Sequence, residues 1–275
     1  MKSILTQLLE ASAWPMNTPR PYSAFHLCLT AAGGLTAFLL ARHLSRARAG
    51  QAAVLPVCGI ILAVSEIYKQ LFLYYIVNGG SFDWWYFPFQ LCSVPMYLCL
   101  LLPLTKKAGL TRTSQAFLTF IQDYGFLGGV MALAEPSGLM HPYWTLTLHG
   151  LLWHLLLLFM GFFCAQSGLG GRSRACFLYA LPLFLFCCAA ATAVNILSHP
   201  YGNADMFYIS PYYPNGQAVF HQIALAVGTL PGNLLYLLSI ILGAAIIHLL
   251  LGRVNSRGSQ ASSRPQQPAR PESRQ

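Results

Sequence analysis

The sequence predicts an all-α fold: a polytopic membrane helical bundle of about seven transmembrane helices, with its N-terminus outside and its C-terminus in the cytoplasm. Hydrophobic residues make up 56% of the 275 positions and charged residues only 8%, whereas a soluble domain usually carries about 25% charged residues. The net charge of +9 comes from basic residues in short blocks between apolar stretches. This placement excludes a nucleic-acid-binding surface and indicates the positive-inside pattern of membrane proteins.

The apolar stretches place the spans, because a transmembrane helix needs about 20 mostly apolar residues. The predicted spans before the last cover residues 22–41, 52–77, 88–104, 114–134, 142–165 and 175–197. The final apolar stretch, 218–251, would reach about 50 Å as one straight helix at about 1.5 Å per residue. Pro231, between Gly228 and Gly232, therefore predicts a break with the last span after it.

Three regions follow: an N-terminal interfacial segment (1–21), the transmembrane domain (22–251) and a disordered basic cytoplasmic tail (252–275). The first residues have one apolar helical face ahead of Trp14, which predicts a short helix on the outer membrane surface. Lys and Arg alternate between loops so that one side of the membrane is basic, and that side is predicted to be cytoplasmic. We expect a multi-pass protein of the plasma membrane.

The cysteines fall within or at the edge of apolar stretches, where most are read as small hydrophobic residues rather than a disulfide framework. Cys92 is the exception, because Pro95 follows it and a proline inside a helix frees the carbonyl four residues back. The predicted kink groups Cys92 with Gln90 and Ser93. In lipid, such groups must be satisfied internally or line a cavity.

Ionisable residues at membrane depth are costly and are functional candidates by default. Glu66 and Lys69 are three residues apart, so they can pair on one helix face, either as a structural pair or as part of a path. Asp123 has no cation in its own helix and needs a partner on another, for which Lys69 is one candidate.

The predicted fifth span contains His149 and His154. They are about 140° apart around a helix, which is poor for joint metal ligation. Each remains open as a general base, a proton relay or a satisfied core residue.

Other polar residues gather after the fifth span. Asn195 and His199 are four residues apart and share a helix face. Asn203 lies in an aromatic loop that resembles a lid, and Asn233 follows the predicted break. No local spacing supports a metal site from the outer residues His141, His199, Asp205 and Glu135. We expect no metal and no other cofactor.

A thiol, a histidine and amide donors at bilayer depth allow acyl transfer. A cysteine thiolate attacks an ester or thioester, a histidine takes and returns the proton, and amide N–H groups hold the oxyanion. A thiol with a pKa of about 8.5 is poorly ionised in lipid. Cys92 therefore needs a partner, either His149 or His154.

The run FPFQLCS at residues 87–93 resembles the (L/F)P(L/F)(H/Q)LC signature of YwaF-like bacterial membrane proteins, which belong with the eukaryotic transmembrane protein 164 family. Looser similarities lie at His149 to His154, at Asn195 with the loop after Asn203, and at Gly232-Asn233. The resemblance covers residues from about 20 to about 250.

This resemblance implies a multi-span bundle and, from the eukaryotic branch, acyltransferase activity on phospholipids. It implies that Cys92 carries the acyl group, assisted by a histidine from a later span, with His149 as the first choice. Many relatives have His where this chain has Gln90, so any role of that His moves to another residue here.

We therefore expect a phospholipid acyltransferase with a Cys92 acyl-enzyme and with membrane lipids as acyl donor and acceptor. Two other classes remain open. A small-molecule or proton-coupled transporter would use Glu66, Lys69, Asp123 and the histidines as a path. A non-catalytic membrane subunit would use its polar residues only to lock helices together. The enzyme requires Cys92 and a histidine within hydrogen-bond reach in a lipid-accessible cavity.

Overall fold

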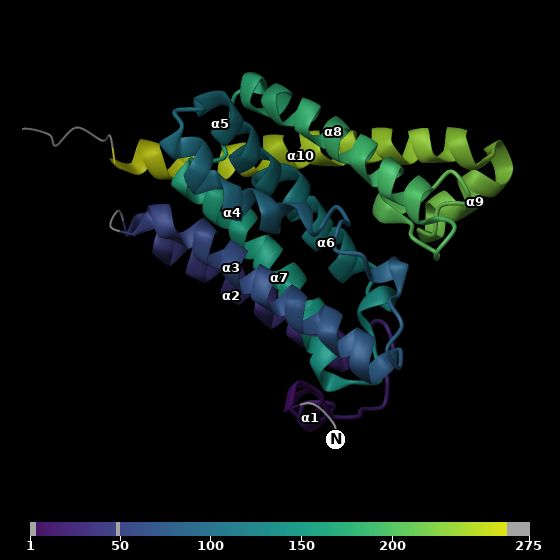
Figure 1. Ribbon diagram of the computed structural model, residues 1–275. Helices are drawn as coiled ribbons and strands as arrows, with labels where there is room; N and C mark the ends of the chain where they lie inside the picture. The colour runs from purple at the N-terminus through teal and green to yellow at the C-terminus, as the bar shows by residue number, and fades with distance from the viewer. Residues whose placement is uncertain (1–3, 48–49, 263–275) are drawn as a thin grey trace, which may run out of the picture.

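The computed structural model describes residues 4–47 and 50–262, with side chains as far as 253. Over these residues the chain is helical, and its extended pairing is a single bridge between Pro15 and Tyr143. The helices are α1 Ile4–Ala11, α2 Ala24–Arg46, α3 Gln51–Phe72, α4 Val94–Lys107, α5 Thr111–Phe120, α6 Phe126–Ala134, α7 Trp144–Ser167, α8 Arg174–Ser198, α9 Ala218–Val227 and α10 Thr229–Ser262 (Figure 1).

Shorter turns continue or connect these helices. The π-helical turn η1 (Leu73–Val77) extends α3, and the π-helical turn η3 (Ile121–Gly125) joins α5 to α6. The 3₁₀ turns are η2 Trp84–Tyr86, η4 Ser137–Leu139 and η5 Met206–Tyr208. π-helical turns inside α-helices are frequent at functional sites, and η3 contains Asp123.

Six helical segments are long and apolar enough to cross a membrane: Ala24–Arg46, Gln51–Val77, Thr111–Ala134, Trp144–Ser167, Arg174–Ser198 and Thr229–Arg253. The polytopic all-helical bundle is thus confirmed. The remaining predicted span, 88–104, corresponds to α4, which has 14 residues and is shorter than the roughly 20 that a span needs. The count of seven and the orientation stay predictions.

The predicted kink inside a helix at Pro95 is wrong. Helix α4 begins at Val94 with Ser93 as its N-cap, so Pro95 lies in the first turn, where a missing N–H leaves no helical bond unmade. Residues 87–93 form an irregular segment before the helix. The backbone around Cys92 is therefore non-helical, although the cause is a late helix start and not a kink.

The predicted break in the last apolar stretch is confirmed. It falls at Gly228, whose φ of 95° and ψ of 157° suit only glycine. Pro231 lies in the first turn of α10. Helix α9 folds back so closely on α10 that a Cβ at Gly232 would lie 2.8 Å from the Cα of Ala224.

Helix α7 is central to the packing, with contacts to α2, α3, α6 and α10. In Figure 1, α2, α3 and α7 form one limb, α8 and α10 form another, and α4 to α6 lie between the two limbs.

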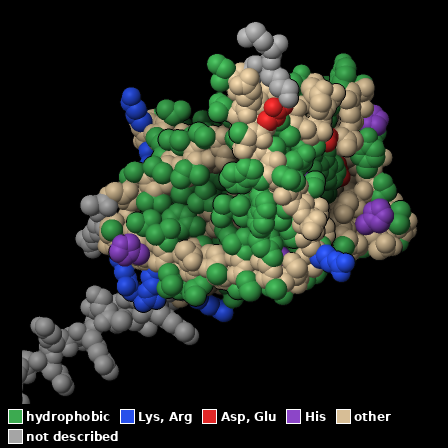
Figure 2. Space-filling view, turned by 90° about the horizontal axis from the view of Figure 1, so that it is seen from below, with side chains coloured by type: hydrophobic (Ala, Val, Ile, Leu, Met, Phe, Trp, Pro, Cys, Tyr) green, Lys and Arg blue, Asp and Glu red, His purple; other side chains and the backbone are tan. Residues whose placement is uncertain are grey.

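Exposed apolar side chains such as Ile67, Phe186 and Leu238 cover the outward faces. Figure 2 shows one face dominated by hydrophobic side chains, with Lys and Arg toward its margins. Such a surface suits contact with lipid.

Both ends of the described chain are helical. Helix α1 forms, and its Leu9 is buried with Phe72, Leu73 and Leu146. The backbone N–H of Trp144 donates to the carbonyl of Trp14, which ties the N-terminal segment to the start of α7. At the other end, α10 continues to Ser262, past the predicted tail boundary at 252, and the rest of that tail (263–275) lies outside the described residues.

Candidate functional site

Two ends of the bundle are distinguished by their loops. We call the end with loops 78–93, 135–143 and 199–217 the strap end, and the end with loops 47–50, 108–110 and 168–173 the basic end. The second name reflects Lys and Arg residues that flank those loops: Arg42, Arg46, Lys106, Lys107, Arg112, Arg172 and Arg174.

Cys92 lies at the strap end, two residues before α4. It is half-buried, and its carbonyl accepts a 3.1 Å hydrogen bond from the indole N–H of Trp153 on α7. The next residue, Ser93, is buried. A helix N-terminus carries a partial positive charge, which favours a thiolate beside it.

Gln90 and Asn195 hold one loop from two sides. The Gln90 amide donates to the carbonyl of Asp205 at 3.0 Å and accepts from the N–H of Phe207 at 2.8 Å. The Asn195 amide, fully buried on α8, donates to the carbonyl of Met206 at 3.1 Å and accepts from its N–H at 2.6 Å. We call residues 203–217 the strap. Both amides act on the strap backbone, so the structure gives them a holding role.

The strap contains two aromatic residues in left-handed backbone, Phe207 at φ 59° and Tyr208 at φ 57°. Such φ values are rare for bulky side chains and persist only where the surroundings impose them. Asn215 donates to the carbonyl of Tyr208 at 2.8 Å, and Asn233 of α10 donates to the carbonyl of Ser210 at 3.0 Å. Tyr208 lies within electrostatic range of Cys92.

Asp205 belongs to the strap and is buried. Its carboxylate accepts a 2.8 Å hydrogen bond from the N–H of Ser210. Burial raises the pKa of Asp205 to about 6, and the hydrogen bond from Ser210 offsets part of that rise. The strap therefore contains a group that titrates near neutrality.

The two histidines of α7 differ in their hydrogen bonding. Nδ1 of His154 lies 2.6 Å from the carbonyl of Gly150, one turn back on the same helix. Nε2 of His149 is buried without a hydrogen-bond partner. The His149 ring lies 5.4 Å from the ring of Trp153, the residue that contacts Cys92. In the described part of the chain, no hydrogen bond joins the Cys92 thiol to either histidine, so reach between thiol and base stays a prediction.

The predicted pair between Glu66 and Lys69 is present, with 2.8 Å between the charged groups. Gln70 donates to the Glu66 carboxylate at 2.7 Å and to the carbonyl of Tyr86 at 2.6 Å. These bonds tie α3 to the segment that leads to Cys92, and both charges lie within electrostatic range of that residue. The pair is therefore part of the surroundings of Cys92.

Asp123 does not pair with Lys69. Its partner is His248 of α10, with Nδ1 2.8 Å from the Asp123 carboxylate. His248 was not among the predicted site residues, because nothing local to a single histidine in an apolar stretch points to Asp123 as its partner. The requirement for a cation on another helix was correct, and His248 was a further residue in the sequence able to meet it.

His199 and Asn203 are exposed, and the neighbours described for them do not include Cys92. His199 stacks on Tyr212 with 3.7 Å between ring centroids, at the surface, whereas Asn195 is fully buried. Their shared helix face therefore does not form one site.

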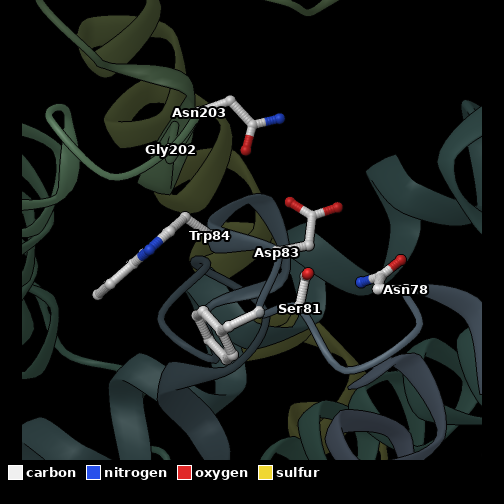
Figure 3. Close-up of a pocket in the computed structure, with 7 residues that line it drawn as sticks. Asn78, Ser81, Asp83, Trp84, Gly202 and Asn203 are labelled. Atoms are coloured by element: carbon white, nitrogen blue, oxygen red, sulfur yellow. The ribbon is translucent and has the colours of Figure 1, made fainter. Parts of the chain in front are cut away.

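Asn203 lines an open depression of about 170 Å³ with Asn78, Asp83 and Trp84. Figure 3 shows the Asp83 carboxylate and the two amides turned toward a common space, with the Trp84 ring turned away.

The four outer residues considered for a metal do not gather. No group of three or more His, Cys, Asp or Glu side chains arranged to hold a metal ion occurs within 4–47 and 50–262. His199 interacts instead with Tyr212 and Tyr213, and Asp205 with the N–H of Ser210.

The fold and the polar residues within it define a multi-pass helical membrane protein. The chain belongs to the TMEM164 family, whose model matches residues 18–252. No curated protein and no solved structure matches the chain. The family resemblance read from residues 87–93 is thus confirmed, while the bacterial branch and the particular membrane stay predictions.

Proposed function

We propose that this protein is a membrane-embedded lipid acyltransferase that works through an acyl-enzyme on Cys92. The observation that carries the proposal is the position of Cys92 in irregular backbone directly before the α4 N-terminus. Trp153 fixes its carbonyl, and Gln90 fixes the same segment to the strap. A nucleophile on such a braced segment is positioned for attack.

In this mechanism the Cys92 thiolate attacks the ester carbonyl of a donor lipid. The base takes the thiol proton, the carbon–sulfur bond forms, the ester carbon–oxygen bond breaks, and the leaving alkoxide takes that proton from the base. The hydroxyl oxygen of an acceptor lipid then attacks the thioester and loses its proton to the base, the carbon–sulfur bond breaks, and the departing thiolate regains the proton from the base. His149 is the better base, because its Nε2 has no partner, whereas Nδ1 of His154 is engaged within α7.

The oxyanion is served by backbone donors rather than by side-chain amides. The amides of Gln90, Asn195 and Asn233 each donate to a strap carbonyl, and these bonds direct them to the strap backbone. In the first turn of α4, Pro95 has no N–H and the N–H of Met96 already donates to the carbonyl of Ser93 at 3.1 Å. The backbone N–H of Val94, two residues after Cys92, is therefore the donor for the oxyanion, and the positive end of the helix dipole adds to it.

No observation favours transport in the same way. Glu66 pairs with Lys69 at the strap end, and Asp123 pairs with His248 toward the basic end. Each pair contains its own countercharge, and the two pairs lie on different helices. A proton or substrate path would instead need groups that exchange partners across the full thickness of the membrane.

Intact-mass analysis of the full chain, purified with lipid, tests this proposal. After incubation with an ester phospholipid donor, we expect an acyl-sized mass increment that hydroxylamine removes. Cys92→Ser should lose it, and Cys99→Ser should retain it. Cys99 is a fair control because it is fully buried on α4, the helix that follows Cys92, with its sulfur 3.6 Å from that of Met160. No adduct on the wild-type protein with excess donor would contradict the covalent mechanism.

A further inference from the structure

Helix α10 docks on the bundle through a buried acid and a buried histidine. Asp123 lies in the π-helical turn η3 and is 0% exposed, while His248 is 4% exposed. The carboxylate lies 2.8 Å from Nδ1 of His248, and its other oxygen accepts from the Gln122 amide at 3.0 Å. Nε2 of His248 lies 3.2 Å from the backbone carbonyl of Ser173, in the loop between α7 and α8.

These contacts fix the number of protons that the pair holds. A backbone carbonyl only accepts hydrogen bonds, so Nε2 of His248 must carry a proton to bind Ser173. The contact between Nδ1 and the carboxylate needs one more proton, which either atom can hold. We propose that Asp123 and His248 form a proton-binding site in which one shared proton locks α10 to the α7–α8 loop.

Removing the shared proton breaks one of the two contacts. The neutral imidazole then has a single N–H, which can serve Asp123 or the Ser173 carbonyl but not both. The other nitrogen presents a lone pair to an oxygen, and a carboxylate is left buried without a countercharge. Both consequences are costly in a site that is closed to water.

Adding a second proton is equally unfavourable. An imidazolium and a protonated carboxyl then face each other. The extra hydrogen points at Nδ1–H or at the donating amide of Gln122, and a net positive charge is buried. The lock is therefore tightest in an intermediate pH range and weakens on both sides of it.

The surroundings contain little that would compensate. Tyr124 of η3 and Cys164 of α7 lie within electrostatic range of Asp123, and both are uncharged at neutral pH by their ordinary pKa values. Phe177 of α8 packs its ring 5.6 Å from that of His248. Lys106 of α4 is within electrostatic range of Cys164. The backbone of Arg172, and not its charged side chain, acts on His248.

The loop also has ties that do not titrate. Thr119 donates to the carbonyl of Gly170 at 2.6 Å, and Gln115 donates to the carbonyl of Leu169 at 3.1 Å. Loss of the His248 contact therefore loosens α10 against the loop without unfolding the loop itself. This makes the effect local, so that it is separable from general destabilisation.

Asp123→Asn is the informative variant. An asparagine can accept from Gln122 through its oxygen and donate to Nδ1 of a neutral His248 through its nitrogen. It reproduces the hydrogen-bond pattern of the singly protonated pair with hydrogens that do not dissociate. Asp123→Ala offers neither bond, and His221→Gln changes a histidine at the strap end, where its ring binds the carbonyl of Asn215.

Hydrogen exchange of the full chain in nanodiscs at about pH 5, 7 and 9 tests the lock, with rates corrected by an unfolded reference peptide. In the wild-type protein, we expect protection of residues 168–173 and 244–253 to be greatest near neutral pH and to fall about tenfold outside that range. Asp123→Asn should keep the protection and remove its alkaline loss. Asp123→Ala should lower it at every pH, and His221→Gln should match wild type.

Two results would overturn the inference. One is wild-type protection in these segments that stays constant from pH 5 to 9 after correction, which would show that no proton controls the contact. The other is an Asp123→Asn protein as poorly protected as Asp123→Ala, which would show that the carboxylate charge, and not the shared hydrogen, holds α10.

Discussion

The strap end and the basic end treat their polar groups differently. At the strap end, Gln90, Asn195 and Asn233 hold the backbone of residues 205–210, while the groups proposed to react take no part in these hydrogen bonds. Among the described residues, the Cys92 thiol makes no hydrogen bond to another helix, and Nε2 of His149 has no partner. Toward the basic end, the ionisable groups of Asp123 and His248 bind each other and the carbonyl of Ser173, whereas the buried amide of Gln166 on α7 has no partner. The comparison therefore concerns ionisable and nucleophilic groups: we expect chemistry where they lack partners and a structural role where they are paired.

The largest expected effect comes from replacing the Cys92 thiol. Cys92→Ser should reduce acyl transfer by about a thousandfold or more, because removing a covalent nucleophile removes the pathway itself. Lipid profiling of transfer products checks this, with Cys99→Ser expected to keep most of the activity. Full activity in Cys92→Ser would remove the distinction between the two ends.

The side-chain amides that hold the strap should contribute to the stability of the fold. Asn195→Ala removes two hydrogen bonds from a fully buried position and should lower the free energy of unfolding by about 2–4 kcal/mol. Thermal unfolding in detergent measures this. Asn203→Ala, at an exposed position of the same strap, should change it by less than about 0.5 kcal/mol. Equal effects at both positions would mean that the strap is not held as described.

A close helix approach at the strap end gives a third test. Gly232→Ala places a Cβ 2.8 Å from the Cα of Ala224, which should cost about 1–3 kcal/mol because the neighbour is backbone and cannot turn aside. Gly34→Ala is the matched change, since no atom lies within 4 Å of its Cβ, and alanine should stabilise that helix by up to about 1 kcal/mol. A neutral Gly232→Ala would argue against the fold-back of α9.

The smallest expected effect is a pH dependence of the strap. Burial raises the pKa of Asp205 from 3.8 to about 6, so the folded strap binds a proton more tightly than the unfolded chain does. Its contribution to stability is present below about pH 4 and is lost as pH rises through about 6. Protease cleavage within residues 203–217 should therefore be slower at pH 5 than at pH 7, and Asp205→Asn should remove that difference. Faster cleavage at pH 5 would reverse the sign.

The sequence predicted the helices and their approximate bounds because hydrophobic length alone determines a span. It located the break near Pro231, since Gly228 and Pro231 act locally on the backbone. It misplaced the kink near Cys92, because Pro95 is disruptive within a helix and harmless in its first turn. The choice between those positions depends on where the helix begins, which the strap contacts of Gln90 help to set.

The site was predictable residue by residue but not in its connections. Glu66 and Lys69 were correctly paired because they lie on one helix. Asp123 and His248 are 125 residues apart, so their contact depends on tertiary packing that a single sequence does not specify. Trp153 lies between His149 and His154 in the sequence, and nothing in that position predicts its role. Its contact with the Cys92 carbonyl follows from how α7 packs against the segment before α4.

Peptide-level mapping of the acyl group after incubation with an ester phospholipid tests the central claim most directly. The account predicts a single hydroxylamine-sensitive adduct on the peptide containing Cys92, strongly reduced in His149→Gln and unchanged in Asp123→Asn. An adduct on a different cysteine, or one on Cys92 that depends on Asp123 as much as on His149, would contradict the assignment of chemistry to the strap end.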